Sequence, residues 1–211
     1  MAVRRFSLIS ESEARTIEPG STVELERGGH VTPLARDTPR ARRVQVVPLG
    51  TTDPSLPPDL APAATVTRVA IGSDHSGVAL KAALVAHLRQ AGKSVDDLGT
   101  SGSEPVDYPD IAAGVARAVA RGEADAGIVI DGAGLGSAIA ATKVDGVRAA
   151  MCVNVTLARY ARQHNGANVL ALGSTLVTIE EARSMVDTFI DTPMTEPRYI
   201  ARLAKVRALE R

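Results

Sequence analysis

The sequence predicts a parallel α/β fold for the part of the chain that follows residue 66. Two observations carry this prediction. From residue 67 onward, short aliphatic or β-branched runs alternate with longer runs of helical periodicity, which is typical of βαβ units. In addition, 45% of the residues are hydrophobic but only 2% are aromatic, as expected where aliphatic strands are covered on both faces. We therefore expect a five-stranded parallel sheet in a Rossmann-like three-layer α/β/α sandwich, with an N-terminal extension.

Strands and helices are expected to alternate through residues 67–211. The predicted strands are 67–72, 94–98, 126–130, 147–153 and 169–172. The predicted helices are 78–91, 111–121, 137–143, 156–163, 179–190 and about 198–211. Four of the strands are almost uniformly apolar, whereas the strand at 94–98 contains Asp96 and Asp97 and is expected at an edge of the sheet.

The first 66 residues have a different composition. Residues 48–66 are rich in Pro, Thr and Ala and almost uncharged, so we expect a poorly packed linker there. Residues 1–47 alternate weakly at 22–25 and 43–46, enough for two short strands but not for an independent core. The sequence thus predicts an extension (1–47), a linker (48–66) and one domain (67–211).

Charge and composition exclude several classes of function. The 24 basic and 24 acidic residues cancel, so no overall field favours nucleic acid or an anionic membrane. Cys152 is the single cysteine and cannot form an internal disulfide, and the N-terminus lacks a secretory pattern. The apolar stretches are too short or too interrupted to span a bilayer. We expect a cytoplasmic protein with no nucleic-acid or membrane partner.

Polar residues follow several of the predicted strands. Because ligands of parallel sheets bind beyond the carboxyl ends of the strands, we expect these residues to meet on one rim. Asp74 and His75 follow the first strand, Tyr108 follows the second, and His164 with Asn165 lies near the fifth. A structural role remains open for some of them, since Asp is a common helix cap and a histidine at a helix end is often a surface residue.

A glycine-rich loop follows the third strand and reads Asp131-Gly132-Ala133-Gly134-Leu135-Gly136. Alternate glycines allow successive N–H groups to turn toward one point ahead of a helix, which forms an anion-binding nest for an oxyanion or phosphate. The spacing is neither the dinucleotide fingerprint nor the Walker loop, so nucleotide binding is disfavoured. The alternative is that the glycines serve only close helix–strand packing.

The series of motifs resembles the ribose-5-phosphate isomerase B and galactose-6-phosphate isomerase family over about residues 67–211. The resemblance rests on an ordered set of segments. They are Gly72-Ser73-Asp74-His75-Ser76-Gly77, Asp107-Tyr108-Pro109, the glycine-rich loop, Lys143, Gly146-Val147-Arg148-Ala149, Arg162-Gln163-His164-Asn165, Asn168-Val169-Leu170, and Arg198 with Arg202.

The resemblance implies interconversion of an aldose and a ketose phosphosugar through an enediolate, without metal or cofactor. It implies that His164 assists ring opening and that Arg198 and Arg202 bind the phosphate. It also implies a homodimer, with tetramers left open, in which the partner's His164 and C-terminal arginines complete each site. The sugar-binding residues that it implies are Asp74, His75, Tyr108, Gly132, Gly134, Gly136, Ser137 and Asn165.

The chain departs from the family at the catalytic base. Relatives usually have a cysteine at the position of Asp131, or a glutamate at the position of Ser137. We expect Asp131 to be the base, with a pKa that burial raises toward neutrality. The alternative is a non-catalytic or regulatory protein that binds a phosphosugar. A common arginine is also missing, because Gly173-Ser174 is followed by Thr175.

The extension also contains a short resemblance. Residues 31–37, Val-Thr-Pro-Leu-Ala-Arg-Asp, look like an element of enzymes from bacterial microcompartments. This resemblance implies that residues 1–47 dock the protein to a shell or cargo partner inside a microcompartment. The alternative is a loosely attached arm.

Overall fold

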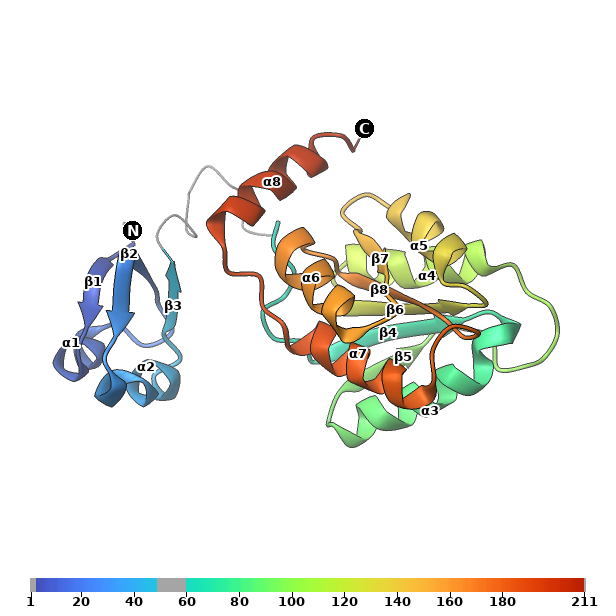
Figure 1. The fold of residues 1–211 in the computed structure, drawn as a ribbon, viewed down its shortest axis with the longest axis horizontal. Helices are drawn as coiled ribbons and strands as arrows, with labels where there is room; N and C mark the ends of the chain where they lie inside the picture. Colours follow the sequence, from blue (N-terminus) through green and yellow to red (C-terminus); the bar gives the residue numbers. More distant parts are fainter. Residues whose placement is uncertain (1–2, 49–59, 211) are drawn as a thin grey trace. The chain divides into compact units, whose positions relative to one another are not determined.

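The computed structural model describes residues 3–48 and 60–210. The chain divides into two compact units, residues 1–60 with 195–204 and residues 61–194 with 205–211, and each unit has its own sheet (Figure 1). Helix α8 (Pro197–Arg207) contributes residues to both units. Residues 195–204, which the sequence assigned to the 67–211 domain, are thus grouped with the first unit.

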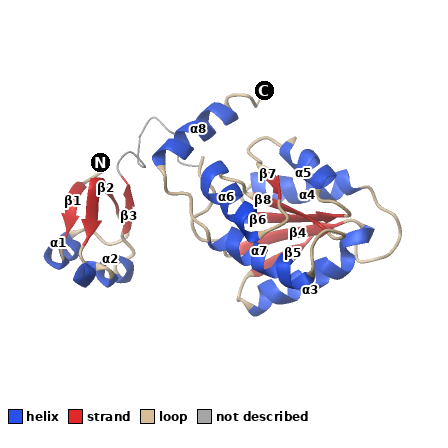
Figure 2. Cartoon of the chain, viewed as in Figure 1, coloured by secondary structure: helices blue, strands red, loops and turns tan. Residues whose placement is uncertain are grey.

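The second unit has the predicted five-stranded parallel sheet, with strand order β5-β4-β6-β8-β7 (Figure 2). The fold class is therefore confirmed as Rossmann-like. The prediction that residues 94–98 form an edge strand is confirmed as well, since β5 pairs only with β4. The strands are β4 (Arg68–Ser73), β5 (Ser94–Asp97), β6 (Ala126–Asp131), β7 (Ala149–Met151) and β8 (Val169–Gly173).

Helices cover both faces of this sheet (Figure 1). Apolar residues of α3, α6 and α7 pack with alternate strand residues on one face, and those of α4 and α5 pack on the other. The strands face apolar residues on both sides, which explains their nearly continuous aliphatic sequences. The helices are α3 (Val78–Gln90), α4 (Tyr108–Ala120), α5 (Leu135–Thr142), α6 (Val155–Asn165) and α7 (Ile179–Asp191), and a short 3₁₀ helix, η2 (His75–Gly77), precedes α3.

The strand order contains a topological switch point between β4 and β6. From β4 the chain first reaches β5 on one side, and it then returns to β6 on the other side of β4. The chain leaves β4 toward β5 and leaves β6 toward β7 at the other edge of the sheet, so the loops after β4 and β6 diverge, and ligands of open parallel sheets bind at such a point. The loops in question begin at Asp74 and Gly132.

The first unit corrects one expectation from the sequence. Its three strands form a parallel sheet in the order β1-β2-β3, and a hydrophobic cluster that includes Phe6, Ile9 and Ile17 packs against it. Residues 1–47 therefore do contain a small core, because buried side chains from strands, helices and turns combine in a way that the weak alternation of each strand does not reveal. The elements are β1 (Arg5–Ile9), α1 (Glu11–Thr16), β2 (Thr22–Val31), η1 (Pro33–Ala35), α2 (Asp37–Ala41) and β3 (Gln45–Pro48).

The predicted linker falls mainly on residues 49–59, which lie outside the described residues. At its end, Leu60 and Val66 are almost fully buried, and Val66 belongs to the core under α3, α6 and α7. The expectation of poorly packed chain is thus wrong at these two positions. Within the described ranges, no helix is long and apolar enough to cross a membrane.

Candidate active site

The loop after β4 brings a carboxylate and an imidazole to the switch point. The Asp74 carboxylate is almost buried and accepts hydrogen bonds from the Ser76 N–H (2.9 Å) and the Ser76 hydroxyl (2.6 Å). These bonds close the turn that starts η2. The Val106 N–H donates to His75 Nδ1 at 3.4 Å, so His75 connects this turn to the segment that precedes α4. With Nδ1 as the acceptor, the proton of neutral His75 lies on Nε2, which is then a donor.

Tyr108, the first residue of α4, lies at the switch point as well. It is 40% exposed, and its ring lies against the backbone of Gly136, where an added Cβ would be only 2.5 Å from the Tyr108 Cζ atom and 2.9 Å from its hydroxyl oxygen. Only glycine fits at position 136 while the phenol stays in place. The contact sets the Tyr108 hydroxyl beside the N-terminus of α5.

The glycine-rich loop surrounds the carboxylate of Asp131, the last residue of β6. Asp131 Oδ1 accepts from the Ala133 N–H at 2.8 Å and from the Gly134 N–H, and Oδ2 accepts from the Ser137 N–H at 2.8 Å. Gly134 makes this arrangement possible with its φ of +76°, a left-handed conformation that other residues rarely adopt. The N–H groups of Ala133, Gly134 and Ser137 are called the nest from here on, and the oxygen atoms that they bind are those of Asp131.

The expected rise in the pKa of Asp131 is wrong. Burial by itself would raise this pKa, but the hydrogen bonds from the hydroxyl and N–H of Ser137 and from the N–H groups of Gly134 and Ala133 outweigh it, so the pKa of Asp131 is lowered. The carboxylate is therefore ionised at neutral pH although only 6% of Asp131 is exposed. The sequence indicated the burial, but the direction of the N–H groups depends on the folded loop.

Ser174 and Thr175 carry hydroxyl groups at this rim and were not predicted from the sequence as site residues. Thr175 Oγ1 donates to the carbonyl oxygen of Gly132 at 2.7 Å, and the Ser174 hydroxyl lies 3.4 Å from the Ser76 hydroxyl. Ser174 and Thr175 directly follow β8. The strand-end rule could have found them, because β8 pairs with β6 beside Asp131.

His164 and Asn165 do not join the rim within one chain. They end α6, which starts at the carboxyl end of β7 and runs back toward the amino end of β8, so His164 lies about 15 Å along the helix from the rim. The predicted convergence of all these residues on one rim of a single chain is therefore wrong. The His164 ring stacks on Tyr160 with 4.6 Å between centroids, and Asn165 Nδ2 donates to the Tyr160 carbonyl at 3.2 Å.

Arg198 and Arg202 lie one turn apart in α8, on residues grouped with the first unit. Both are exposed, and both guanidinium groups lie over the ring of Tyr199, at 4.7 and 5.7 Å from its centroid. Arg198 Nη2 also donates to the Tyr199 hydroxyl at 3.0 Å. Tyr199 thus holds the two positive charges together.

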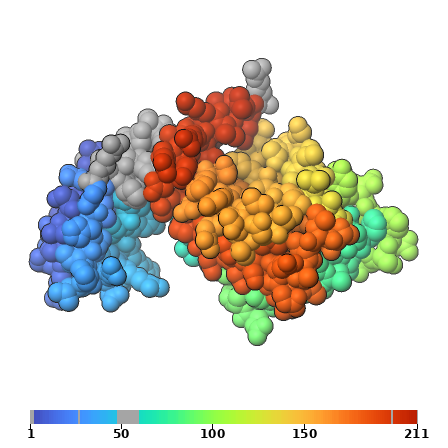
Figure 3. Space-filling view, viewed as in Figure 1, coloured from blue at the N-terminus to red at the C-terminus, as the bar shows by residue number. Residues whose placement is uncertain are grey.

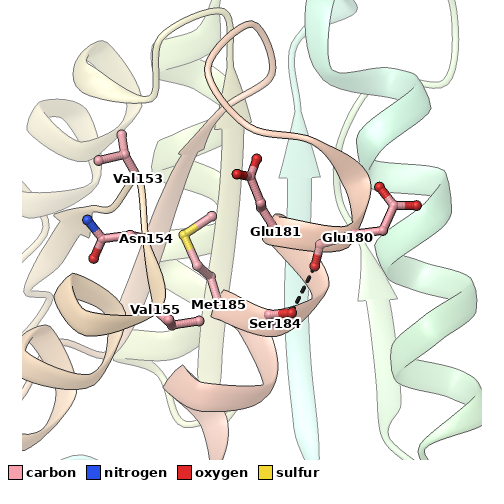
Figure 4. Close-up of a pocket in the computed structure, with 7 residues that line it drawn as sticks. All are labelled: Val153, Asn154, Val155, Glu180, Glu181, Ser184 and Met185. Carbon is pink, nitrogen blue, oxygen red and sulfur yellow. Dashed lines mark hydrogen bonds between the residues drawn. The ribbon is translucent and has the colours of Figure 1, made fainter.

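A separate pocket of about 370 Å³ opens between the N-termini of α6 and α7 (Figure 4). None of the predicted site residues lines it. Its polar groups are engaged locally, since Asn154 caps α6, the Glu181 carboxylate accepts from the N–H of the α7 cap Thr178, and the Ser184 hydroxyl donates to the Glu180 carbonyl at 2.9 Å. The pocket is lined by Val153, Asn154, Val155, Glu180, Glu181, Ser184 and Met185.

In the space-filling view, the side chains of α6 and α7, drawn in orange, cover the face of the second unit that is turned toward the viewer (Figure 3). Among the described residues, no group of three or more His, Cys, Asp or Glu side chains is placed to hold a metal ion. The candidate site consists of Asp74, His75, Tyr108 and the loop headed by Asp131, all at the switch point.

Comparisons with known proteins identify the family and agree with the fold of the second unit. Residues 69–206 match the family described as Ribose/Galactose Isomerase. Ribose-5-phosphate isomerase B of Escherichia coli is 45% identical over 143 residues, which cover 68% of this chain and 96% of that protein. The solved structure of ribose-5-phosphate isomerase B from Clostridium thermocellum is 47% identical, with a TM-score of 0.67 over 68% of this chain and 97% of that one. The type B enzyme of Trypanosoma cruzi is 41% identical, with a TM-score of 0.66 over 68% and 97% of the two chains.

Proposed function

Because the chain belongs to the ribose/galactose isomerase family, whose members similar to it are sugar-phosphate isomerases, we propose a specific reaction for it. The protein interconverts ribose 5-phosphate and ribulose 5-phosphate, or a similar pair of phosphosugars, through an enediolate. The observation that carries the proposal is the meeting of Asp74, His75 and Tyr108 with the Asp131 loop at the switch point. The relatives named ribose-5-phosphate isomerase B make ribose 5-phosphate the first substrate to test.

Asp131 is the proposed base. The C–H bond beside the carbonyl breaks, its proton goes to the Asp131 carboxylate, and the electron pair forms the enediolate. The proton then returns to the neighbouring carbon, which was the carbonyl carbon, while the hydroxyl proton on the deprotonated carbon passes to the former carbonyl oxygen, so that the carbonyl changes places. Asp131 is ionised and so able to accept a proton, but its lowered pKa makes it a weak base. The side chains of Asp74, His75 and Tyr108 supply hydrogen bonds for the sugar hydroxyls.

We propose that the enzyme is a homodimer with shared sites, in which the partner's His164 assists ring opening and the partner's Arg198 and Arg202 bind the phosphate. His164 lies far from Asp131 along α6, so His164 can reach an Asp131 rim only from a second chain. Apolar side chains are available to bury between two chains, because Leu135 and Ile139 on α5 are 59% and 64% exposed. Paired arginines suit a phosphate group.

The central experiment follows ribose 5-phosphate, and tetrose phosphates in parallel, by NMR. We expect the resonances of the ketose to appear with wild-type protein, and a loss of about 10²–10⁴-fold in rate with Asp131→Asn. Asp131→Cys, which restores the residue common in the family, should keep measurable activity. Asp110→Asn is the matched control, since Asp110 is an exposed carboxylate in the first turn of α4. Unchanged turnover in Asp131→Asn would exclude Asp131 as the base.

Subunit mixing tests the shared site. Asp131→Asn and His164→Ala each inactivate a homodimer, but a mixed dimer has one site with both groups intact. Random exchange of subunits should therefore recover about a quarter of the wild-type activity. If each site were built within one chain, the mixture would stay inactive.

One observation favours a second candidate function. The fixed Asp131 carboxylate, in place of a cysteine, is consistent with a non-catalytic or regulatory protein that binds a phosphosugar. Calorimetry with ribose 5-phosphate separates the two, because this candidate binds the sugar while no ketose forms by NMR.

We further propose that the protein works in the cytoplasm and that residues 1–47 dock it to a microcompartment partner. Support comes from Leu34, which is 85% exposed within the segment 31–37. In cells that make microcompartments, Leu34→Glu should disperse a fluorescent fusion that otherwise forms foci, with no loss of isomerase activity. The control is Leu209→Glu, at a leucine that is 78% exposed in the other unit. Diffuse fluorescence of the unsubstituted fusion would refute the docking role.

A further inference from the structure

Among the described residues, the Asp131 carboxylate is held by the N–H groups of the nest and by no cation. Within the described residues, no Lys, Arg or His forms an ion pair with Asp131, and only N–H and hydroxyl donors surround it. Burial penalises the charged form of a carboxyl group, and residue Asp131 is only 6% exposed. The hydrogen bonds from these donors outweigh that penalty and lower the pKa of Asp131.

These donors are the same groups that would stabilise an enediolate oxygen. The Ala133 and Gly134 N–H groups both point at Oδ1, and the Ser137 N–H points at Oδ2. Each N–H has one hydrogen to donate, so a sugar oxygen cannot use these groups while the Asp131 carboxylate holds them. Two ionised oxygens in the same place would also repel each other.

We infer that Asp131 is the resting occupant of the nest, and that a negatively charged ligand oxygen gains these N–H groups only after the Asp131 carboxylate has been neutralised or displaced. The inference rests on the proposed function for its role in catalysis. Proton transfer from the sugar to Asp131 neutralises the carboxylate at the moment when the sugar oxygen becomes charged. The N–H groups of the nest then donate to the enediolate oxygen in place of the carboxylate, and the net charge of the site does not change.

Asp131 is thereby a specificity-determining residue. The resting site excludes ligands that carry a charge at the reacting end, such as a carboxylate or a phosphate next to the carbonyl. It accepts a neutral carbonyl end and a phosphate at the far end of the sugar. The loop is open to such ligands from outside, because Gly132 and Ala133 are partly exposed and a Cβ on Gly132 would meet only the Ser76 hydroxyl, at 3.8 Å.

Binding of inorganic phosphate, measured by NMR shifts of the nest amides and by calorimetry, tests this inference without any turnover. In wild type, phosphate should leave the amides of Ala133, Gly134 and Ser137 unchanged. In Asp131→Ala, phosphate should shift all three, with an affinity at least about tenfold above wild type. Asp131→Asn should be intermediate, because its amide oxygen can still accept from Ala133 and Gly134 while its NH₂ group cannot accept from Ser137.

Two controls make the result specific. Asp110→Asn removes one negative charge from the start of α4 without touching the nest, and its nest amides should respond as in wild type. Phosphate bound by Arg198 and Arg202 would shift amides of α8 and not those of the nest. The inference is overturned if phosphate shifts the wild-type nest amides as tightly as in Asp131→Ala, or if folded Asp131→Ala and Asp131→Asn both leave them unshifted. A protein with no isomerase activity would still give either answer.

Discussion

Replacing Asp131 by asparagine should destabilise the protein by an amount that depends on pH. The asparagine oxygen can keep the bonds from Ala133 and Gly134, but its NH₂ group meets the Ser137 N–H and leaves that buried donor without an acceptor. An unsatisfied buried donor costs about 1–3 kcal/mol. Removal of a buried charge offsets the weakening of the other two bonds, so we expect a loss of about 1–3 kcal/mol in the free energy of unfolding at pH 7.

The pH dependence follows from the lowered pKa of Asp131. A carboxylate with a lowered folded-state pKa adds stability that is fully present above its unfolded-state pKa, about 3.9, and lost as the pH falls through its folded-state value. Asparagine does not titrate. The difference between wild type and Asp131→Asn should therefore stay constant from about pH 8 to pH 5 and become smaller below about pH 4.

Urea unfolding of both proteins at a series of pH values measures this difference, with Asp110→Asn as the control, expected within about 0.5 kcal/mol of wild type. A raised pKa would give the opposite trend, because the buried charge would then cost stability as the pH rises. A gap that widens on acidification, or a variant more stable than wild type at pH 7, would refute our account of the nest.

Three other substitutions or probes test the remaining structure. Gly136→Ala should displace the Tyr108 phenol and lower kcat/KM for the sugar by roughly 2- to 10-fold, whereas Gly114→Ala, with no atom within 4 Å of the new Cβ, should leave the kinetics unchanged and stabilise α4 by about 0.5–1 kcal/mol. Thr178→Ala removes the cap of α7 and should cost about 1 kcal/mol in urea unfolding; no measurable loss would show that the cap contributes nothing. Burial raises the pKa of Cys152 to about 11, so the native thiol should stay unreactive toward a disulfide reagent at pH 8 until urea is added. Rapid native labelling would contradict this.

Much of the fold is readable from the sequence because its signals are local. Mainly aliphatic runs of four to six residues predicted β4, β6 and β8 within one residue at each end, and the aspartates at 96 and 97 predicted the edge position of β5. The sheet of the first unit was harder to predict. Its core combines Phe6 and Ile9 of β1 with Ile17 beyond α1, and no single stretch shows that pattern.

For the candidate site as well, some features could be predicted from the sequence and others could not. By itself, the sequence determined the parallel sheet, the glycine-rich loop after its third strand and the presence of Asp131 at the head of that loop, because these follow from residue type and short-range spacing. Only the tertiary structure decided that the loop turns its N–H groups onto Asp131 and that the end of α6 that carries His164 points away from the rim. Both depend on the directions in which the chain leaves its strands and helices, and these directions lower the pKa of Asp131 and keep His164 away from it within one chain.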